Sequence, residues 1–314
     1  MTMKAPGRRS RVAVIGVPMD LGSNLRGVDM GPSAIRIAGV VEQLRELGCR
    51  IKDFGNVAVP HASVVGIGSA SMRYAEPIKM TCELLATAIE SSLEDSNTPV
   101  VLGGDHSIAM GTLAGLARYG LSRKRKKRRR YGLLWVDAHA DANTPRTTPS
   151  GNVHGMPLAV ALGRGDKRFT ELGGPAPMID ASSAVLLAVR DVDLGERDNL
   201  RKLGLRVITM REIDERGVFE CTTEALDIVN AGTDGFHLSV DMDCLDPRLA
   251  PGVGTPVPGG LTVREAHLVM ELVADSRQMV SCEFVEVNPV IDQRNMTAEL
   301  AAGLIRSALG GKIL

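Results

Sequence analysis

The amino-acid sequence predicts a three-layer α/β/α domain with a mostly parallel sheet of about eight strands. Short apolar, β-branched runs recur along the 314 residues and alternate with longer segments of helical periodicity. No linker rich in Pro, Gly or Ser and no internal repeat divides the chain, so we expect one domain over residues 1–314. Hydrophobic residues make up 44% of the chain and aromatics only 3%, which predicts a core of mainly aliphatic side chains.

The order of these segments defines the expected topology. Strands are predicted, in chain order, at Arg11–Pro18, Ile51–Val57 (the weakest pattern), Pro99–Gly103, Gly132–Asp137, Ser183–Arg190, Leu205–Met210, Phe236–Asp241 and Val280–Val287. Helices are predicted between them at Pro32–Leu47, Tyr74–Leu93, Thr112–Tyr119, Arg197–Leu203, Phe219–Asn230, Val263–Ala274 and Ala298–Leu309. Strands joined through helices run parallel with right-handed crossovers, and their ligands bind beyond the carboxyl ends of the strands.

Composition excludes several classes of protein. Lys plus Arg equals Asp plus Glu at 37 each, and the sequence pI is about 7.0, which argues against a chain that coats nucleic acid or an acidic membrane. The five cysteines are scattered and lack a C-x-x-C pair, as is typical of reduced cytosolic thiols. The apolar run Val12–Val17 is too short for a secretion signal, and no stretch reaches membrane-spanning length. We therefore expect a cytoplasmic protein.

Acidic residues and histidines gather just after three of the predicted strands. In Asp137-Ala-His-Ala-Asp141, residues two apart leave an extended chain on the same side, so the three polar groups can converge. Asp241-Met-Asp243 repeats the spacing after another strand, and His106 follows a third. The predicted cluster has two imidazoles and four carboxylates: His106, Asp137, His139, Asp141, Asp241 and Asp243.

The composition of this cluster predicts a metal centre. Four neighbouring carboxylates need a counter-charge to stay ionised, and the number of ligands suits two divalent ions about 3.5–4 Å apart better than one. Oxygen-rich ligands without thiolates favour manganese over zinc, while cobalt and nickel stay open. Asp241-Met-Asp243 or Gly103-Gly-Asp-His106 alone is more typical of a turn or a helix cap, and the D-x-H-x-D pattern of residues 137–141 is a stronger signal. The coincidence of all three at strand ends favours the metal site.

Three segments resemble the metal signatures of the arginase/agmatinase ureohydrolase family: Gly103-Gly-Asp-His-Ser107, Asp137-Ala-His-Ala-Asp141 and Ser239-Val-Asp-Met-Asp243. The resemblance covers nearly the whole chain, from Gly31-Pro-Ser33 onward. Three further segments are similar to arginases rather than agmatinases: Asn143-Thr-Pro with Ser150-Gly-Asn-Val-His-Gly-Met-Pro157, Gly254-Thr-Pro-Val-Pro-Gly-Gly260 and Val285-Glu-Val-Asn-Pro289. One departure is Ala142, where many arginases carry a larger aliphatic residue.

The resemblance implies two Mn²⁺ ions per subunit and hydrolysis of L-arginine to L-ornithine and urea. One ion would be held by His106, Asp137, Asp141 and Asp241. The other would be held by Asp137, His139, Asp241 and Asp243. Asp137 and Asp241 would bridge the ions, and a bridging hydroxide would attack the guanidinium carbon.

The family also implies roles for other residues. Glu286 would hold the planar guanidinium through paired N–H···O bonds. Asp141 would orient the hydroxide and pass its proton to the departing amine, with His154 as proton shuttle. The α-carboxylate would be bound by Asn143, Ser150 and Asn152, and the α-ammonium by Asp193 and Glu196. Thr255 would support Glu286 or the urea group, whereas Glu196 could instead be only a helix cap and His154 only a loop brace.

Several alternatives stay open at this point. An agmatinase or another guanidino-acid ureohydrolase would share the metal ligands and differ in the loop from Asn143 to Asn152. A binuclear phosphoesterase also uses clustered Asp and His but needs basic groups for phosphate, where this site offers Glu286. A binding protein would use the basic run Arg123–Arg130, but the neutral net charge favours a solvated loop, so nucleic acid is not expected. The family further implies a homo-oligomer, a trimer or a hexamer. His61, His237 and His267 are interpreted as structural or surface residues.

Overall fold

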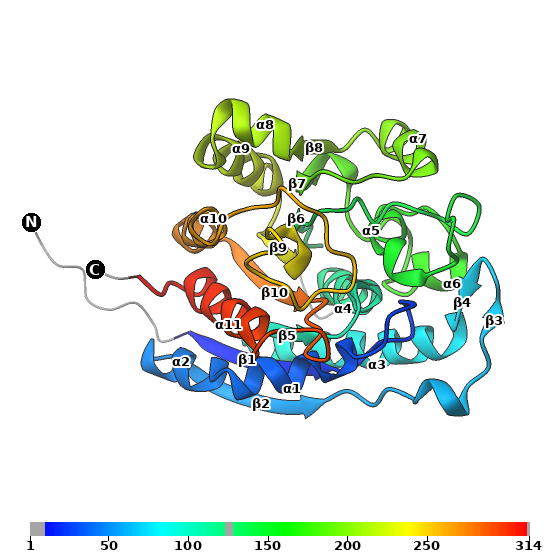
Figure 1. The fold of residues 1–314 in the computed structure, drawn as a ribbon, viewed down its shortest axis with the longest axis horizontal. Helices are drawn as coiled ribbons and strands as arrows, with labels where there is room; N and C mark the ends of the chain where they lie inside the picture. The colour runs from blue at the N-terminus through cyan, green and yellow to red at the C-terminus, as the bar shows by residue number, and fades with distance from the viewer. Residues whose placement is uncertain (1–9, 123–127, 313–314) are drawn as a thin grey trace, which may run out of the picture.

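The computed structural model describes residues 10–122 and 128–312, and its centre is an eight-stranded parallel sheet (Figure 1). The strand order across the sheet is β2-β1-β5-β10-β9-β6-β7-β8. The strands are β1 (Arg11–Val17), β2 (Arg50–Asn56), β5 (Thr98–Gly103), β6 (Gly132–Val136), β7 (Ala184–Val189), β8 (Arg206–Thr209), β9 (Phe236–Asp241) and β10 (Met279–Val285). Each overlaps a run predicted from the sequence, so the expected α/β class and parallel sheet are confirmed.

Helices cover both faces of the sheet and complete the three layers (Figure 1). One face packs against α1 (Gly31–Ile37), α2 (Val40–Glu46), α8 (Met210–Arg216), α9 (Val218–Asn230), α10 (Val263–Ser276) and α11 (Met296–Ala308). The opposite face packs against α3 (Ala75–Glu94), α4 (Ala109–Leu121), α5 (Pro157–Ala161) and α6 (Lys167–Thr170). The helix α7 (Leu194–Leu203) follows β7. No helix in the described part of the chain is both long and apolar enough to span a membrane.

Burial on both faces explains why the central strands read as continuous apolar runs. In β6, Leu134 and Val136 belong to the core on one face, whereas Leu133 and Trp135 belong to the core on the other. All four side chains are completely buried. An alternating polar pattern would leave one of these two cores without its apolar side chains.

The structure differs from the sequence prediction at a few elements. The single helix expected at Pro32–Leu47 is two helices, because the chain turns at Gly39, whose φ of 80° favours glycine. The short helices α5, α6 and α8 were not predicted, and neither was the two-stranded hairpin of β3 (Gly68–Ser69) and β4 (Met72–Arg73). Each is seven residues or shorter, which is too short for a periodic pattern to reveal.

Candidate metal centre and substrate pocket

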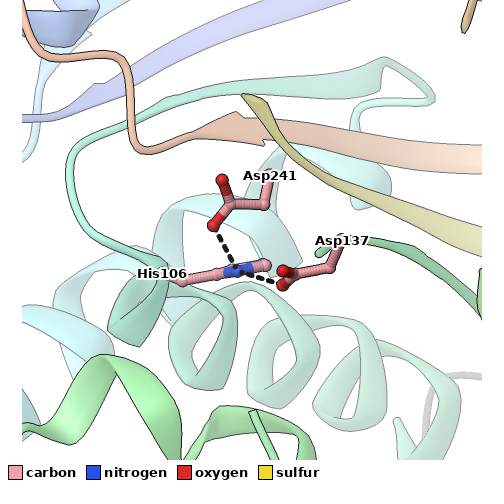
Figure 2. Close-up of side chains that lie close together, drawn as sticks. All are labelled: His106, Asp137 and Asp241. Carbon is pink, nitrogen blue, oxygen red and sulfur yellow. Dashed lines mark ion pairs between the residues drawn. The ribbon is translucent and has the colours of Figure 1, made fainter. Parts of the chain in front are cut away.

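Three of the central strands bring the predicted metal ligands together at their carboxyl ends. His106 follows β5, Asp137 follows β6, and Asp241 is the last residue of β9. These three side chains point at one another from separate strands (Figure 2). A second group of possible ligands, formed by Asp137, His139 and Asp243, shares Asp137 with the first. The convergence inferred from residues two apart is therefore what the structure shows.

His106 faces three carboxylates through one ring nitrogen. Its Nδ1 atom lies 3.2 Å from Asp137 Oδ2, 3.1 Å from Asp141 Oδ2 and 3.3 Å from Asp241 Oδ2. The imidazole is completely buried, yet within the described residues this nitrogen has no hydrogen-bond partner. A buried polar atom without a partner is rare in proteins and needs an explanation. A divalent ion among the three oxygens and the nitrogen supplies one.

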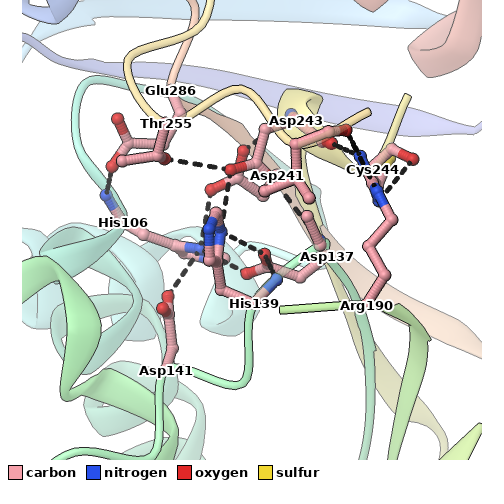
Figure 3. A network of polar contacts seen from close by, with 12 residues as sticks. His106, Asp137, His139, Asp141, Arg190, Asp241, Asp243, Cys244, Thr255 and Glu286 are labelled. Carbon is pink, nitrogen blue, oxygen red and sulfur yellow. Dashed lines mark hydrogen bonds and ion pairs between the residues drawn. The ribbon is translucent and has the colours of Figure 1, made fainter. Parts of the chain in front are cut away.

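Asp137 has the arrangement expected of a bridging ligand. Its Oδ2 faces His106, while its Oδ1 lies 3.6 Å from His139 Nδ1. His139 Nδ1 is in turn 3.0 Å from Asp243 Oδ2. The two oxygens of one carboxylate thus face two different histidines (Figure 3), an arrangement that suits a carboxylate shared by two ions.

Neighbouring groups fix the orientation of these ligands. The indole Nε1 of Trp135 donates a 2.9 Å hydrogen bond to Asp137 Oδ2, and the same ring stacks on His106 with centroids 4.1 Å apart. His106 Nε2 lies 2.8 Å from the hydroxyl of Ser239. The hydroxyl of Thr255 donates to Asp243 Oδ2 at 3.1 Å, so its hydrogen bond goes to a metal ligand and not to Glu286. Such partners hold the ligand atoms in place for an ion.

The electrostatics of the cluster match an acidic site that lacks its counter-charge. Burial, and next the charge of Asp243, raises the pKa of Asp241 well above its usual value. Burial and the charge of Asp137 raise the pKa of Asp141 to about 6. Burial alone would lower the pKa of His106, but the three facing carboxylates raise it well above its ordinary value. Divalent cations would replace these protons as the counter-charge.

Glu286 lies beside the metal ligands and keeps one oxygen available. Its Oε1 accepts hydrogen bonds from the backbone N–H of His106 at 2.8 Å and contacts His154 Nδ1 at 3.0 Å. Its Oε2 is buried and has no partner among the described residues. Burial lowers the pKa of His154, but the charge and hydrogen bond of Glu286, together with the charges of Asp141 and Asp105, raise that pKa to about 9. Glu286 adopts φ 64° and Asp141 φ 49°, in the left-handed region that non-glycine residues seldom occupy.

The predicted substrate residues line one pocket next to the metal ligands. Its walls include Asn143, Ser150, Asn152, Asp193, Glu196, His154 and Thr255, together with His139, Asp141 and Asp241. In this pocket the side-chain amide of Asn143 donates to Asp193 Oδ2 at 2.9 Å. Glu196 accepts the backbone N–H groups of Ala142 and Asp193, so it also caps the start of α7 as the alternative interpretation held. Burial and the charge of Asp141 raise its pKa to about 7.

Sequence reasoning did not assign roles to several groups that support the site. Arg190 donates hydrogen bonds to backbone carbonyls on the loop that carries Asp243, among them those of Asp243 itself and Val257 (Figure 3). Gly151, with φ 75°, lies against the hairpin of β3 and β4, because a Cβ there would be 1.8 Å from the carbonyl oxygen of Ala70. The backbone of Arg73 also donates to Gly151 O. The glycine at position 151 is the feature of the sequence that could have indicated this close contact.

The basic run singled out in the sequence stays apart from the site. Residues 123–127 of the basic run lie outside the described residues, and Arg128–Arg130 are exposed just before β6, at the edge of the sheet opposite the ligands. The five cysteines, as expected, form no disulfide: Cys49, Cys82, Cys221, Cys244 and Cys282 are all free thiols.

A parallel α/β sheet with clustered aspartates and histidines beyond its central strands defines an α/β enzyme with a metal site at the carboxyl edge. Residues 10–310 match the sequence model of the arginase family, and the chain belongs to that family of hydrolases. It is 46% identical over 304 residues to the arginase of Bacillus caldovelox, covering 96% of this chain and 99% of that one.

Solved structures give the same result. The crystal structure of the Bacillus caldovelox arginase at pH 5.6 matches with a TM-score of 0.91 at 46% identity, covering 97% of this chain and 100% of that one. The arginase of Entamoeba histolytica, solved in complex with L-ornithine, matches with a TM-score of 0.86 at 29% identity, covering 96% and 99% of the two chains. The resemblance found in the sequence is therefore confirmed over nearly the whole chain.

Proposed function

We propose that this chain hydrolyses the guanidinium group of L-arginine to L-ornithine and urea at a centre of two Mn²⁺ ions. Membership of the arginase family supports the reaction class, and the relative from Entamoeba histolytica was solved with L-ornithine, the expected product. The residues proposed to hold the ions are His106, Asp137, His139, Asp141, Asp241 and Asp243. When bound, two such ions lower the pKa of a shared water so that it attacks as hydroxide.

The observation that carries the proposal is the unpartnered Oε2 of Glu286. A buried carboxylate oxygen without a donor carries a desolvation cost, which a cationic N–H donor removes. A guanidinium is a planar cation with several N–H groups, and it binds carboxylates in a fixed geometry. A phosphate ester would instead be repelled by Glu286, which argues against the phosphoesterase alternative.

Two groups near the metal ligands suit the proton transfers of this reaction. Asp141, whose Oδ2 lies 3.1 Å from His106 Nδ1, can accept the proton of the attacking hydroxide and release it to the departing Nε amine when the bond from that nitrogen to the guanidinium carbon breaks. His154 lies at the pocket wall, partly exposed, and touches Glu286. We propose that it exchanges protons between the leaving amine and solvent.

The substrate is proposed to be arginine because the pocket has groups for both ends of an amino acid. The amide and hydroxyl groups of Asn143, Ser150 and Asn152 suit the α-carboxylate, directly or through water. Asp193 suits the α-ammonium. Agmatine lacks the carboxylate and would leave the loop from Asn143 to Asn152 without a ligand group.

The test is urea release from arginine and from agmatine by chelator-stripped protein, with and without added Mn²⁺. We expect activity on arginine alone and only after Mn²⁺ is restored. Release from agmatine instead would refute the substrate assignment while leaving the metal centre in place. Release of no urea from either substrate would refute the proposed reaction. The oligomeric state and the cytoplasmic location stay predictions.

A further inference from the structure

A ladder of polar side chains crosses the buried face of the sheet behind the metal centre. His237 on β9 is in register with Ser281 on β10, and Ser239 is in register with Glu283. All four side chains are completely buried. A carboxylate in such a place is costly to bury, and apolar residues of similar size are often at least as stable there. Packing alone therefore gives no reason for Glu283.

Neighbouring hydroxyl groups donate hydrogen bonds to Glu283, and one of these hydroxyls, that of Ser239, connects Glu283 to the metal centre. Glu283 Oε1 accepts from the Ser239 hydroxyl at 2.8 Å, and Oε2 accepts from the Thr112 hydroxyl at 2.6 Å. His237 Nε2 lies 3.3 Å from Oε1. Burial by itself raises the pKa of Glu283, but the charge and hydrogen bond of His237, the charge of His106 and the hydrogen bond from Thr112 bring it below its ordinary value. Glu283 is therefore ionised and accepts hydrogen bonds without donating any.

The direction of these hydrogen bonds fixes the tautomer of His106. Because the proton of the Ser239 hydroxyl goes to Glu283, the serine oxygen can only accept from His106 Nε2, which lies 2.8 Å away. In the metal-bound form Nε2 then carries the ring proton, and Nδ1 presents its lone pair to the space among Asp137, Asp141 and Asp241. A carboxylate behind a ligating histidine also increases the basicity of the ligating nitrogen.

We propose that Glu283 is a positioning residue for the metal centre, acting through Ser239 to hold His106 in the tautomer that binds an ion through Nδ1. The inference rests on the proposed metal centre and adds a buried residue of β10, the strand that pairs with β9, whose last residue is Asp241. Its effect is confined to one of the two ions, since His139, in the other ligand group, makes no contact with this ladder among the described residues.

The decisive measurement is a calorimetric titration of the metal-stripped full chain with Mn²⁺, for wild type and Glu283→Gln. A glutamine amide has the same shape but can donate to Ser239, which lets the hydroxyl turn its proton toward His106. We expect one of two Mn²⁺ dissociation constants to rise by about 10- to 100-fold while the other stays within twofold. His106→Asn identifies which constant belongs to the affected ion, because it weakens the same one.

Two further variants separate this role from a general packing effect. Ser239→Ala removes the hydroxyl that connects Glu283 to His106, and it should weaken the binding of the same Mn²⁺ ion to a similar extent. This variant tests the inference even if Glu283→Gln fails to fold. Ser281→Ala is the matched control, because it alters the same ladder only at His237, 2.8 Å from the serine hydroxyl. We expect its two Mn²⁺ constants to equal those of wild type.

Three results overturn the inference: unchanged constants in folded Glu283→Gln and Ser239→Ala, equal weakening of both ions, or equal weakening by Ser281→Ala. A wild-type chain that binds no Mn²⁺ refutes the proposed metal centre itself. If the wild-type chain binds Mn²⁺ and the Glu283 substitution leaves that binding unchanged, only the positioning role is refuted.

Discussion

Arg190 provides the most direct test of which contacts stabilise the site, because its side chain forms hydrogen bonds with several backbone carbonyls of one loop. Its guanidinium donates to the carbonyl oxygens of Asp243 at 2.7 Å, Leu245 at 3.2 Å and Val257 at 2.6 Å. The approach is close, since a Cβ at Gly260 would lie 2.6 Å from Arg190 Nη2. The loop between these carbonyls carries both a metal ligand and the threonine that supports it.

The substitution Arg190→Lys keeps the charge but removes the fork of donors. A single ammonium can reach only part of these carbonyls, so about two charge-assisted hydrogen bonds are lost. At about 1.5–3 kcal/mol each, and reduced because Arg190 is only half-buried, the free energy of unfolding should fall by about 2–3 kcal/mol. Because Asp243 moves with the loop, Mn²⁺ binding should weaken as well.

The assay is equilibrium denaturation of the metal-stripped protein, followed by Mn²⁺ titration. Arg211→Lys is the matched control, since that arginine is on the surface of α8 and, among the described residues, forms an ion pair only with Glu215, four residues further along the same helix. We expect a change below about 0.5 kcal/mol. If Arg190→Lys changes the free energy of unfolding no more than the control does, the carbonyl hydrogen bonds do not stabilise the loop and the reasoning is wrong.

Three other perturbations test separate parts of the site. Glu286→Gln removes the anionic acceptor and should lower kcat/KM for arginine by about 100-fold while Mn²⁺ binding is retained; equal activity would show that the guanidinium binds elsewhere. Gly151→Ala forces a Cβ against the Ala70 carbonyl and should raise KM for arginine with little change in Mn²⁺ binding, whereas Gly66→Ala, with open space around it, should change neither. The pKa values of Asp141 and Glu196 are about 6 and about 7 in the folded, metal-free chain, above their ordinary 3.8 and 4.5. The folded state therefore binds more protons than the unfolded state between these values, and the free energy of unfolding should fall by about 5–6 kcal/mol as pH rises from 4 to 8, at about 1.4 kcal/mol for each pKa unit. Denaturation curves across this range that are flat or rise with pH would contradict that sign.

The sequence predicted the parts of the site that depend on local spacing. The spacing of Asp137, His139 and Asp141 after a strand predicted that they converge. In the structure β6 already ends at Val136 and Asp141 has φ 49°, so the convergence also depends on the conformation of the loop. Which strands lie side by side is a property of the whole sheet, and local spacing does not contain it. To predict that Ser239 pairs with Glu283, one must know the register of β9 against β10. To predict the hydrogen bonds of Arg190, one must know that three backbone carbonyls far along the chain lie next to it.

The short elements that the sequence did not reveal are the ones that hold strained residues in place. Asp141 has φ 49°, which costs about 1 kcal/mol or more for a residue with a Cβ. Its carbonyl oxygen accepts the N–H groups of Leu158 and Ala159 at 3.0 and 3.3 Å, which lie in the first turn of α5 and have no partner within that helix. The helix therefore gains its missing acceptor only if Asp141 keeps the strained conformation. A five-residue helix with no periodic signal thus helps to hold the carboxylate of Asp141 3.1 Å from His106.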